Sequence, residues 1–356
     1  MMNKIHNIIK IIKKNIGHRR LICRCRNEAG EAELSRAGLD IDFFVTASGD
    51  KVDPANNIFP DDILSYKSNE YYLLIWDDLK FSDYENRRYE KMGFSYMDDV
   101  CWASPRPVLI DSNGNKDHIY HYSDCYGNSV SSRSKIKFKI AGSDNHITIG
   151  VNTTLPELVT INNNSNIIVG DNCILNKAHL FFSDNVTLNV KDSVLMDGTY
   201  VFINYDSQIV VGAKTTLNTG RLLTGRNQKV EIGEDCMFSF NTNFLPHDGH
   251  LIWDIRSKKS LNNTTGSQRN SVRIGDHVWI GGDTTFLANT NVGTGSIIGY
   301  RSLINCSFPN NVLLVGSPAK ILKENIAWSR NNISLDEEKD FLNIPEEYRR
   351  FTSSSE

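Results

Sequence analysis

Apolar residues recur at every sixth position near the C-terminal end of this 356-residue chain. They are Ile274, Ile280, Phe286, Val292, Ile298 and Ile304. A glycine directly follows four of them: Gly275, Gly281, Gly293 and Gly299. Six residues make one short strand and one turn, so three such units close a triangular coil whose apolar residues point inward. Because neighbouring coils pair by hydrogen bonds, the sequence predicts a solenoid with a thin continuous core. An antiparallel sandwich would instead show period-two alternation and variable strand spacing.

The same register extends backwards along the chain in triplets with variable offsets between them. The triplets are Ile149/Leu155/Ile161, Val169/Leu175/Phe181, Leu188/Val194/Tyr200, Val211/Leu217/Leu223 and Ile232/Phe238/Phe244. We expect every member to point into the core, and Gly or Asn to take the turn conformations that a Cβ would resist. The predicted repeat domain covers residues 146–316.

Residues 17–104 show a different pattern, in which short apolar runs alternate with helical segments. The pattern predicts strands at Arg20–Cys25, Asp42–Val45 and Tyr71–Trp76, and helices through Glu31–Arg36 and around Tyr84–Met92. This alternation indicates a small Rossmann-like α/β domain. No Gly-x-Gly-x-x-Gly follows the first strand, where the chain reads Arg24 to Gly30, so dinucleotide binding is not supported. Residues 105–145 are interpreted as a connecting segment and residues 317–356 as a C-terminal helix and tail.

Residues 1–16 form a predicted amphipathic basic helix. Ile5, Ile8, Ile9, Ile12 and Ile16 fall at helical spacing, while residues 1–20 hold six basic side chains and no acidic one. Two interpretations follow. The helix packs against its own domain or a partner subunit, which we favour, or residues 1–20 touch an anionic membrane surface.

Charge and cysteine content exclude several classes of protein. A net charge of −3 argues against a polyanion-binding surface over the whole chain, so no nucleic-acid partner is expected. The seven cysteines have no paired zinc spacing, and we interpret them as reduced thiols of a cytosolic protein. They are Cys23, Cys25, Cys101, Cys125, Cys173, Cys236 and Cys306.

The six-residue register stops at Phe244 and resumes at Ile274, so residues 245–273 form a long excursion from the solenoid. Long loops that interrupt a rigid repeat are frequent sites of function. This one carries His247 and His250, and histidine suits proton transfer near neutral pH.

Three segments give the chain a specific resemblance. These are Val272-Arg-Ile-Gly-Asp-His-Val-Trp-Ile-Gly281, the Val292-Gly and Ile298-Gly pairs, and Val315-Gly-Ser-Pro-Ala-Lys320. Over residues 146–330 the chain resembles the hexapeptide-repeat acyltransferases, which fold as left-handed parallel β-helices. Two further segments are similar to O-acetyltransferases of bacterial surface polysaccharides: Glu231-Ile-Gly-Glu-Asp-Cys-Met-Phe-Ser239 and Asp248-Gly-His-Leu-Ile-Trp-Asp254.

The resemblance implies an enzyme that transfers an acetyl group from acetyl-CoA to a sugar hydroxyl of a capsule or lipopolysaccharide, in the cytoplasm. It makes His250 the general base. The second ring nitrogen of a base needs an acceptor that fixes the tautomer, and Asp248, Asp254 or a backbone carbonyl can supply it. His247 is an alternative base or acceptor contact. Trp279, one residue before an inward position, is expected to point outward, where it packs against the acyl donor or the sugar or else forms an intersubunit contact. The implied assembly is a homotrimer with active sites between chains.

The resemblance also implies where the donor binds. Acetyl-CoA would contact Gly281 and Gly299, together with Tyr300, Arg301 and Ser302, and Lys320 would pair with its phosphates. The family often has a small residue where Tyr300 or Arg301 stands, so the chain departs from the pattern there. The segment Ile321–Arg330 is expected to be a helix that closes the end of the solenoid.

Three other interpretations stay open. The first is an N-acetyltransferase acting on an amino sugar nucleotide. The second is a zinc site built from His247, His250 and His277 across chains, as in a β-helical carbonic anhydrase, although the more ordinary interpretation of His277 is a structural side chain. The third is a solenoid without catalytic activity, which leaves the histidine-bearing excursion unexplained.

Overall fold

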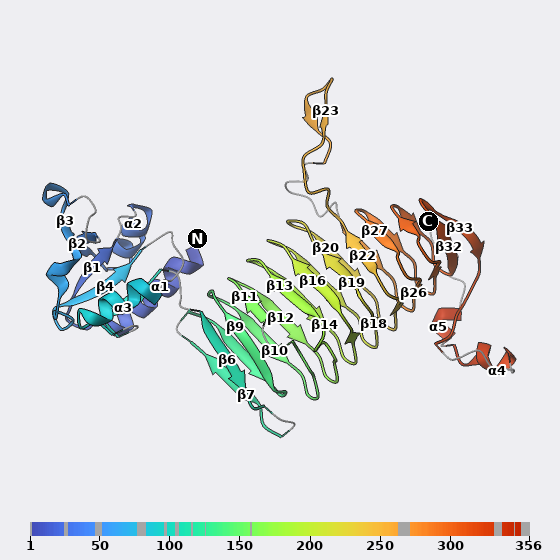
Figure 1. The fold of residues 1–356 in the computed structure, drawn as a ribbon, viewed down its shortest axis with the longest axis horizontal. Coiled ribbons are helices and arrows are strands. Elements are labelled where there is room, and N and C mark those ends of the chain that lie inside the picture. Colours follow the sequence, from blue (N-terminus) through green and yellow to red (C-terminus); the bar gives the residue numbers. More distant parts are fainter. Residues whose placement is uncertain are drawn as a thin grey trace. The chain divides into compact units, whose positions relative to one another are not determined.

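The computed structural model describes residues 2–24, 28–46, 52–76, 83–95, 98–103, 107–114, 117–124, 126–156, 159–262, 271–330, 337–344 and 346–349 (Figure 1). Cys25, Cys125 and residues 263–270 of the predicted excursion lie outside this set. The chain divides into two compact units. Unit 1 comprises residues 1–108, 123–129 and 141–144, and unit 2 comprises the remainder.

Unit 1 contains a five-stranded parallel sheet with the order β3-β2-β1-β4-β5. The strands are β1 (Arg20–Arg24), β2 (Ile41–Thr46), β3 (Ile58–Pro60), β4 (Tyr71–Ile75) and β5 (Val100–Trp102). The helices are α1 (Met2–Asn15), α2 (Glu28–Arg36) and α3 (Asp83–Lys91), with 3₁₀ turns η1 (Pro54–Asn56) and η2 (Asp61–Leu64). The three predicted strands and both predicted internal helices form. Strands β3 and β5 were not predicted, because each is only three residues long.

The first helix, α1, packs against its own unit. Ile8, Ile11 and Ile12 belong to the buried cluster that also holds Leu21 of β1 and Leu34 of α2. The favoured interpretation is therefore confirmed. The alternative, in which residues 1–20 touch an anionic membrane surface, stays a prediction: these isoleucines are buried, while Lys10, Lys13 and Lys14 are exposed. Among the described helices, none combines the length and apolarity needed to span a bilayer.

Unit 2 is a β-helix whose coils pass through three sheets in turn (Figure 1). The first sheet holds β7 (Tyr120–Ser123), β8 (Ser129–Ser132), β10 (His146–Ile149), β12 (Asn166–Val169), β14 (Thr187–Val190), β17 (Gln208–Val211), β20 (Lys229–Ile232), β25 (Val272–Ile274), β28 (Thr290–Val292) and β31 (Ser307–Phe308). The second holds β15 (Leu195–Met196), β18 (Thr216–Leu217), β21 (Met237–Phe238), β26 (Trp279–Ile280), β29 (Ile297–Ile298), β32 (Val312–Gly316) and β33 (Ala319–Glu324). The third holds β6 (Val108–Ser112), β9 (Ile136–Ile140), β11 (Val159–Ile161), β13 (His179–Phe182), β16 (Thr199–Ile203), β19 (Gly220–Leu223), β22 (Thr242–Leu245), β27 (Thr285–Leu287) and β30 (Leu303–Ile304).

The core confirms the ungapped repeat and corrects part of its backward extension. All six residues from Ile274 to Ile304 are buried. Phe181 and Tyr200 are instead exposed, and Leu155 and Leu223 are only half-buried, so these four predictions are wrong. For Phe181, Tyr200 and Leu223 the reason is the turn into the third sheet. It carries the chain from Met196 to the inward Val201 in five residues, one fewer than from Ile280 to Phe286, which moves the inward position by one residue.

The repeat glycines have a different role from the one predicted. Gly275, Gly281, Gly293 and Gly299 do not have positive φ angles; the left-handed turn positions are filled mainly by residues such as Asn185, Asp206 and Asn227. The glycines are required by coil stacking, because a Cβ on Gly281 would lie 2.7 Å from the backbone nitrogen of Tyr300 in the next coil. The expectation was therefore correct for Asn and wrong for these Gly residues.

Both ends of unit 2 differ from expectation. Strands β6 to β9 lie within the predicted connecting segment and join the sheets of the repeat. Ile321–Arg330 is not a helix: β33 (Ala319–Glu324) turns back at Gly316 and pairs antiparallel with β32. The strand forms because its backbone extends the edge of the second sheet and satisfies hydrogen bonds there. Further on, the described helices are short, α4 (Glu337–Leu342) and α5 (Glu346–Arg349).

Candidate functional site

The excursion leaves the β-helix after β22, at the corner where the chain passes from the third sheet to the first. Its start is fixed to the preceding coil: the side-chain amide of Gln228 donates to the carbonyl of Pro246 at 2.8 Å, and the Gly225 backbone donates to Oε1 of Gln228 at 2.5 Å. Farther out, β23 (Trp253–Asp254) and β24 (Lys259–Ser260) form an antiparallel hairpin that belongs to none of the three sheets (Figure 1).

His250 lies in the exposed segment between Pro246 and this hairpin. Among the described residues its imidazole has no hydrogen-bond partner, while its backbone carbonyl accepts a bond of 2.8 Å from Nδ2 of Asn262. The same Nδ2 donates to Oδ2 of Asp248 at 2.8 Å, and Oδ1 of Asn262 accepts from the backbone of Ile252. Asn262 thus holds the turn that presents His250. It gave no signal in the sequence because an isolated Asn in a polar loop is unremarkable.

The two carboxylates proposed to orient His250 are held in different ways. Oδ1 of Asp254 accepts a hydrogen bond from the backbone of Ser257 at 2.6 Å. That bond holds the pKa of Asp254 below its usual value, and the carboxylate serves the turn of its own hairpin. Asp248 makes its contact through Asn262, so in this chain neither carboxylate bonds the His250 ring.

His247 is exposed and lies close to the preceding coil. A Cβ added to Gly225 would come within 2.9 Å of the His247 Cβ, so the backbone of this coil and the start of the excursion are in close contact. The absence of a side chain at Gly225 therefore allows His247 to sit where it does.

Trp279 lies on the outer face of the second sheet, as predicted from its place beside the inward Ile280. Its neighbours across the strands are Met237 and Ile297, which makes an apolar row along the solenoid. The side chain is 41% exposed, and its ring centroid lies 6.0 Å from that of Trp328. This row can accept an apolar, flexible ligand segment.

Tyr300 and Arg301 lie at the corner between the second and third sheets, beside Asp283 of the preceding coil. The Tyr300 hydroxyl donates to the Asp283 carboxylate, which also accepts from Asn241 at 2.6 Å. These bonds hold the pKa of Asp283 below its usual value and raise the pKa of the Tyr300 phenol. Both large side chains that depart from the family pattern, Tyr300 and Arg301, therefore contact the carboxylate of Asp283.

Of the other side chains predicted to contact acetyl-CoA, one is buried and one is exposed. Ser302 is buried and donates to the carbonyl of Gly299 at 2.8 Å, so its hydroxyl serves the fold. Lys320 is exposed on β33, opposite Val315. Within one chain the residues predicted to contact acetyl-CoA lie at or next to the second sheet, whereas His250 follows the third sheet. A single chain therefore does not bring His250 and the predicted acetyl-CoA contacts onto the same corner of the coil.

His277 is a structural residue, as its ordinary interpretation predicts. It is buried, with Nδ1 2.6 Å from Oδ2 of Asp235 and Nε2 2.9 Å from the carbonyl of Trp328. Its ring stacks on Trp328 at 4.1 Å and on Tyr348 at 4.4 Å. Both nitrogens face acceptors, which leaves neither available to zinc and rules out the predicted alternative site that needed His277. No cluster of three metal-binding side chains occurs among the described residues.

No family model matches this chain, and no curated protein matches it. Among solved structures, the polysialic acid O-acetyltransferase OatWY aligns over 57% of this chain and 96% of its own, with 27% identity and a TM-score of 0.52. The polySia-specific acetyltransferase NeuO aligns over 63% and 83%, with 25% identity and a TM-score of 0.40.

A hexapeptide-repeat acetyltransferase from Vibrio cholerae, VCA0836, was solved in complex with acetyl coenzyme A. It aligns over 37% of this chain and 70% of its own, with 22% identity and a TM-score of 0.28. The predicted enzyme class, an acyltransferase, is confirmed by the similarity to OatWY. The resemblance to acetyltransferases of surface polysaccharides is likewise confirmed by this similarity to a polysialic acid O-acetyltransferase.

Proposed function

We propose that this chain is an acetyl-CoA-dependent O-acetyltransferase that modifies a sugar hydroxyl of a bacterial capsule or lipopolysaccharide, with His250 as general base. The observation that carries the proposal is the excursion itself. It interrupts a regular β-helix that is similar to a polysialic acid O-acetyltransferase, and it presents an exposed imidazole without a hydrogen-bond partner among the described residues.

In the proposed step an unprotonated nitrogen of His250 removes the proton from the acceptor hydroxyl. The hydroxyl oxygen attacks the thioester carbonyl of acetyl-CoA, and the carbon–sulfur bond breaks. The departing thiolate takes the proton from the imidazolium, so the products are the acetyl ester and free CoA. The exposed position of His250 is suited to this role, since a buried imidazole bonded on both nitrogens, such as His277, could not exchange protons with a substrate.

The donor would lie along the second sheet. The apolar row of Met237, Trp279 and Ile297 matches the aliphatic pantetheine arm, and the exposed ammonium of Lys320 suits the nucleotide phosphates. Gly281 and Gly299 allow the coils to approach closely, which leaves their backbone near the surface beside this row.

The separation between His250 and the proposed acetyl-CoA row favours a homotrimer with active sites between chains. His250 and the donor row follow different sheets of one chain, so a neighbouring subunit would supply the second half of each site. The hairpin supports this assembly: Leu251 is 56% exposed, Trp253 57% and Ile255 90%, and an apolar surface of this kind is typical of an interface.

The strand order of unit 1 is the one expected of a Rossmann-like sheet, and it supports the proposal that residues 17–104 are a Rossmann-like domain. Without a glycine-rich phosphate loop, we assign it a scaffold or acceptor-binding role. A cytoplasmic location is supported by the free cysteines of the described segments, Cys23, Cys101, Cys173, Cys236 and Cys306.

The test of the proposed function is an acceptor comparison. Purified protein is incubated with acetyl-CoA and either hydroxyl acceptors, such as polysialic acid oligomers, or amino sugar nucleotides. We expect release of CoA thiol and a mass gain of one acetyl group with hydroxyl acceptors. Transfer to the amino acceptor alone would establish the N-acetyltransferase alternative, and no transfer to either class would contradict the proposal.

A further inference from the structure

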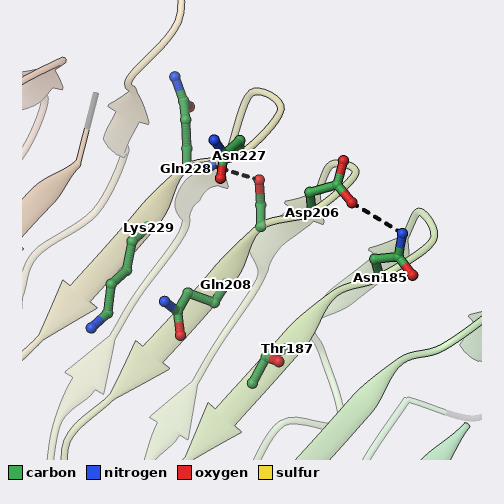
Figure 2. A pocket seen from close by; sticks show the side chains of 8 residues that line it. Asn185, Thr187, Asp206, Gln208, Asn227, Gln228 and Lys229 are labelled. Carbon is green, nitrogen blue, oxygen red and sulfur yellow. Dashed lines mark hydrogen bonds between the residues drawn. The ribbon is translucent and has the colours of Figure 1, made fainter. Parts of the chain in front are cut away.

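A second polar site lies at the corner from which the excursion emerges. It is a pocket of about 250 Å³ built by three successive coils (Figure 2). Its residues form two rows. The corner row is Asn185, Asp206 and Asn227, each in a left-handed turn conformation, and the strand row is Thr187, Gln208 and Lys229, which are direct cross-strand neighbours.

The pocket offers hydrogen-bonding groups that the protein itself does not use. Among the described residues, the side chains of Thr187, Gln208 and Asn227 make no hydrogen bond. The carboxamides of Gln208 and Asn227 each supply donors and an acceptor, and the Thr187 hydroxyl supplies both. A ligand with several hydroxyl groups, each able to donate and accept, is the chemical match for this set.

The two charged side chains that line the pocket are each paired with an opposite charge outside it. Asp206 lies 3.6 Å from Nε of Arg226 and also accepts from Asn185 of the pocket at 3.0 Å, while Lys229 pairs with Glu231. Recognition in the pocket therefore depends on hydrogen bonds rather than on the net charge of the ligand. No apolar side chain lines the pocket, which excludes an acyl chain or other apolar occupant.

The floor of the pocket is rigid and connected to the excursion. The Ser207 hydroxyl donates to the carbonyl of Gly225 at 2.7 Å and accepts from the backbone of Gln228 at 2.9 Å. Gln228 in turn holds Pro246, the residue before His247. Adjacent coils are separated by about 5 Å, so the rows continue along the solenoid toward the coil that presents the histidines.

From this juxtaposition we infer that the pocket is a binding subsite for the acceptor saccharide. It would hold the sugar residues of the saccharide that neighbour the acetylated one. The inference rests on the proposed function. Three equivalent positions in consecutive coils suit a polymer with repeating polar groups, and a preformed pocket lowers the cost of ordering such a flexible ligand.

The test uses Thr187→Ala/Gln208→Ala, because both residues have ordinary backbone conformations and neither belongs to the proposed catalytic site. Thr160→Ala, an exposed threonine of β11 in the third sheet, is the control. Polysialic acid oligomers of increasing length are the probe, with binding measured by titration calorimetry and transfer measured by thiol release. We expect the double variant to raise KM for long oligomers about tenfold, with kcat and the KM for acetyl-CoA unchanged.

Each outcome separates the subsite from the proposed function. If the wild-type chain is active and the double variant keeps the wild-type KM and affinity, the subsite is refuted and the function stands. If the wild-type chain binds oligomers without transferring acetyl groups, and the double variant loses that binding, the subsite stands and the function fails. Equal weakening of short and long oligomers would also overturn the inference, since it would place the contacts at the acetylated residue.

Discussion

The side-chain amide of Asn262 donates a hydrogen bond of 2.8 Å to the carboxylate of Asp248. Because the same amide also bonds the carbonyl of His250, one residue on the other side of the hairpin fixes the turn that carries the proposed base. The position of His250 therefore depends on a contact between the segments that enter and leave this hairpin.

Asn262→Asp tests this dependence. A carboxylate cannot donate to Asp248 and repels it, so we expect kcat to fall about tenfold while the fold, judged by circular dichroism, is unchanged. The control is Asn291→Asp, an exposed asparagine of β28 whose side chain has no hydrogen-bond partner among the described residues. Equal rates for Asn262→Asp and the control would show that the contact does not position the site.

The stacked arrangement of His277, Trp328 and Tyr348 makes a prediction about stability. Replacing His277 by Asn keeps a residue that tolerates the left-handed conformation but removes the ring and its bond to the Trp328 carbonyl. We expect a loss of about 2–4 kcal/mol in the free energy of unfolding, measured by denaturant titration. His179→Asn, at an exposed position of β13, should change stability by less than about 0.5 kcal/mol.

The lowered pKa of Asp235 leads to a prediction for the pH dependence of the free energy of unfolding. Burial raises the pKa of its carboxyl, but the hydrogen bond from His277 and the charge of Arg330 outweigh burial and leave the pKa below the usual 3.8. Because the folded-state pKa is the lower one, the stabilisation is present above pH 3.8 and is lost as the pH falls through the folded value. Asp235→Asn should therefore show a smaller loss of stability than the wild type on acidification below 3.8. Parallel curves for the two proteins would contradict this.

The exposed hairpin predicts the assembly. Ile255, 90% exposed, should be covered by a neighbouring subunit in the proposed trimer. Ile255→Asp places a charge in that interface, so we expect light scattering to report a mass near one third of the wild-type value. Lys259→Asp on the same hairpin is the control for a change of charge. A monomeric wild type, or a trimer that survives Ile255→Asp, would exclude this interface.

The sequence predicted the β-helix from a single physical regularity. Residues such as Ile280 and Phe286 recur at six because three strands and three turns must close each coil, and all six of them are buried. Where the coil contains a shorter turn, as between Met196 and Val201, the same rule pointed to Tyr200, which is exposed. Turn length depends on backbone conformation at a few residues, and the spacing of apolar residues does not encode it.

The site was predictable only in part. The interrupted register located the excursion, and family resemblance selected His250 within it. The anchoring residues Asn262 and Gln228 could not be found, since each acts through a contact with a segment distant in sequence. The C-terminal strand β33 was mistaken for a helix because its apolar residues, such as Ile321 and Leu322, fit either period over six residues.

The most direct test of the central claim is the rate of acetyl transfer by His250→Ala, compared with His247→Ala, in the presence of saturating acetyl-CoA and a hydroxyl acceptor. General base catalysis by one histidine predicts that His250→Ala lowers kcat by about 10²–10⁴-fold with the fold and assembly intact. His247→Ala should retain most of the wild-type rate. If His250→Ala keeps a rate close to the wild type, or if His247→Ala is the variant that loses activity, the assignment of His250 as the base is wrong.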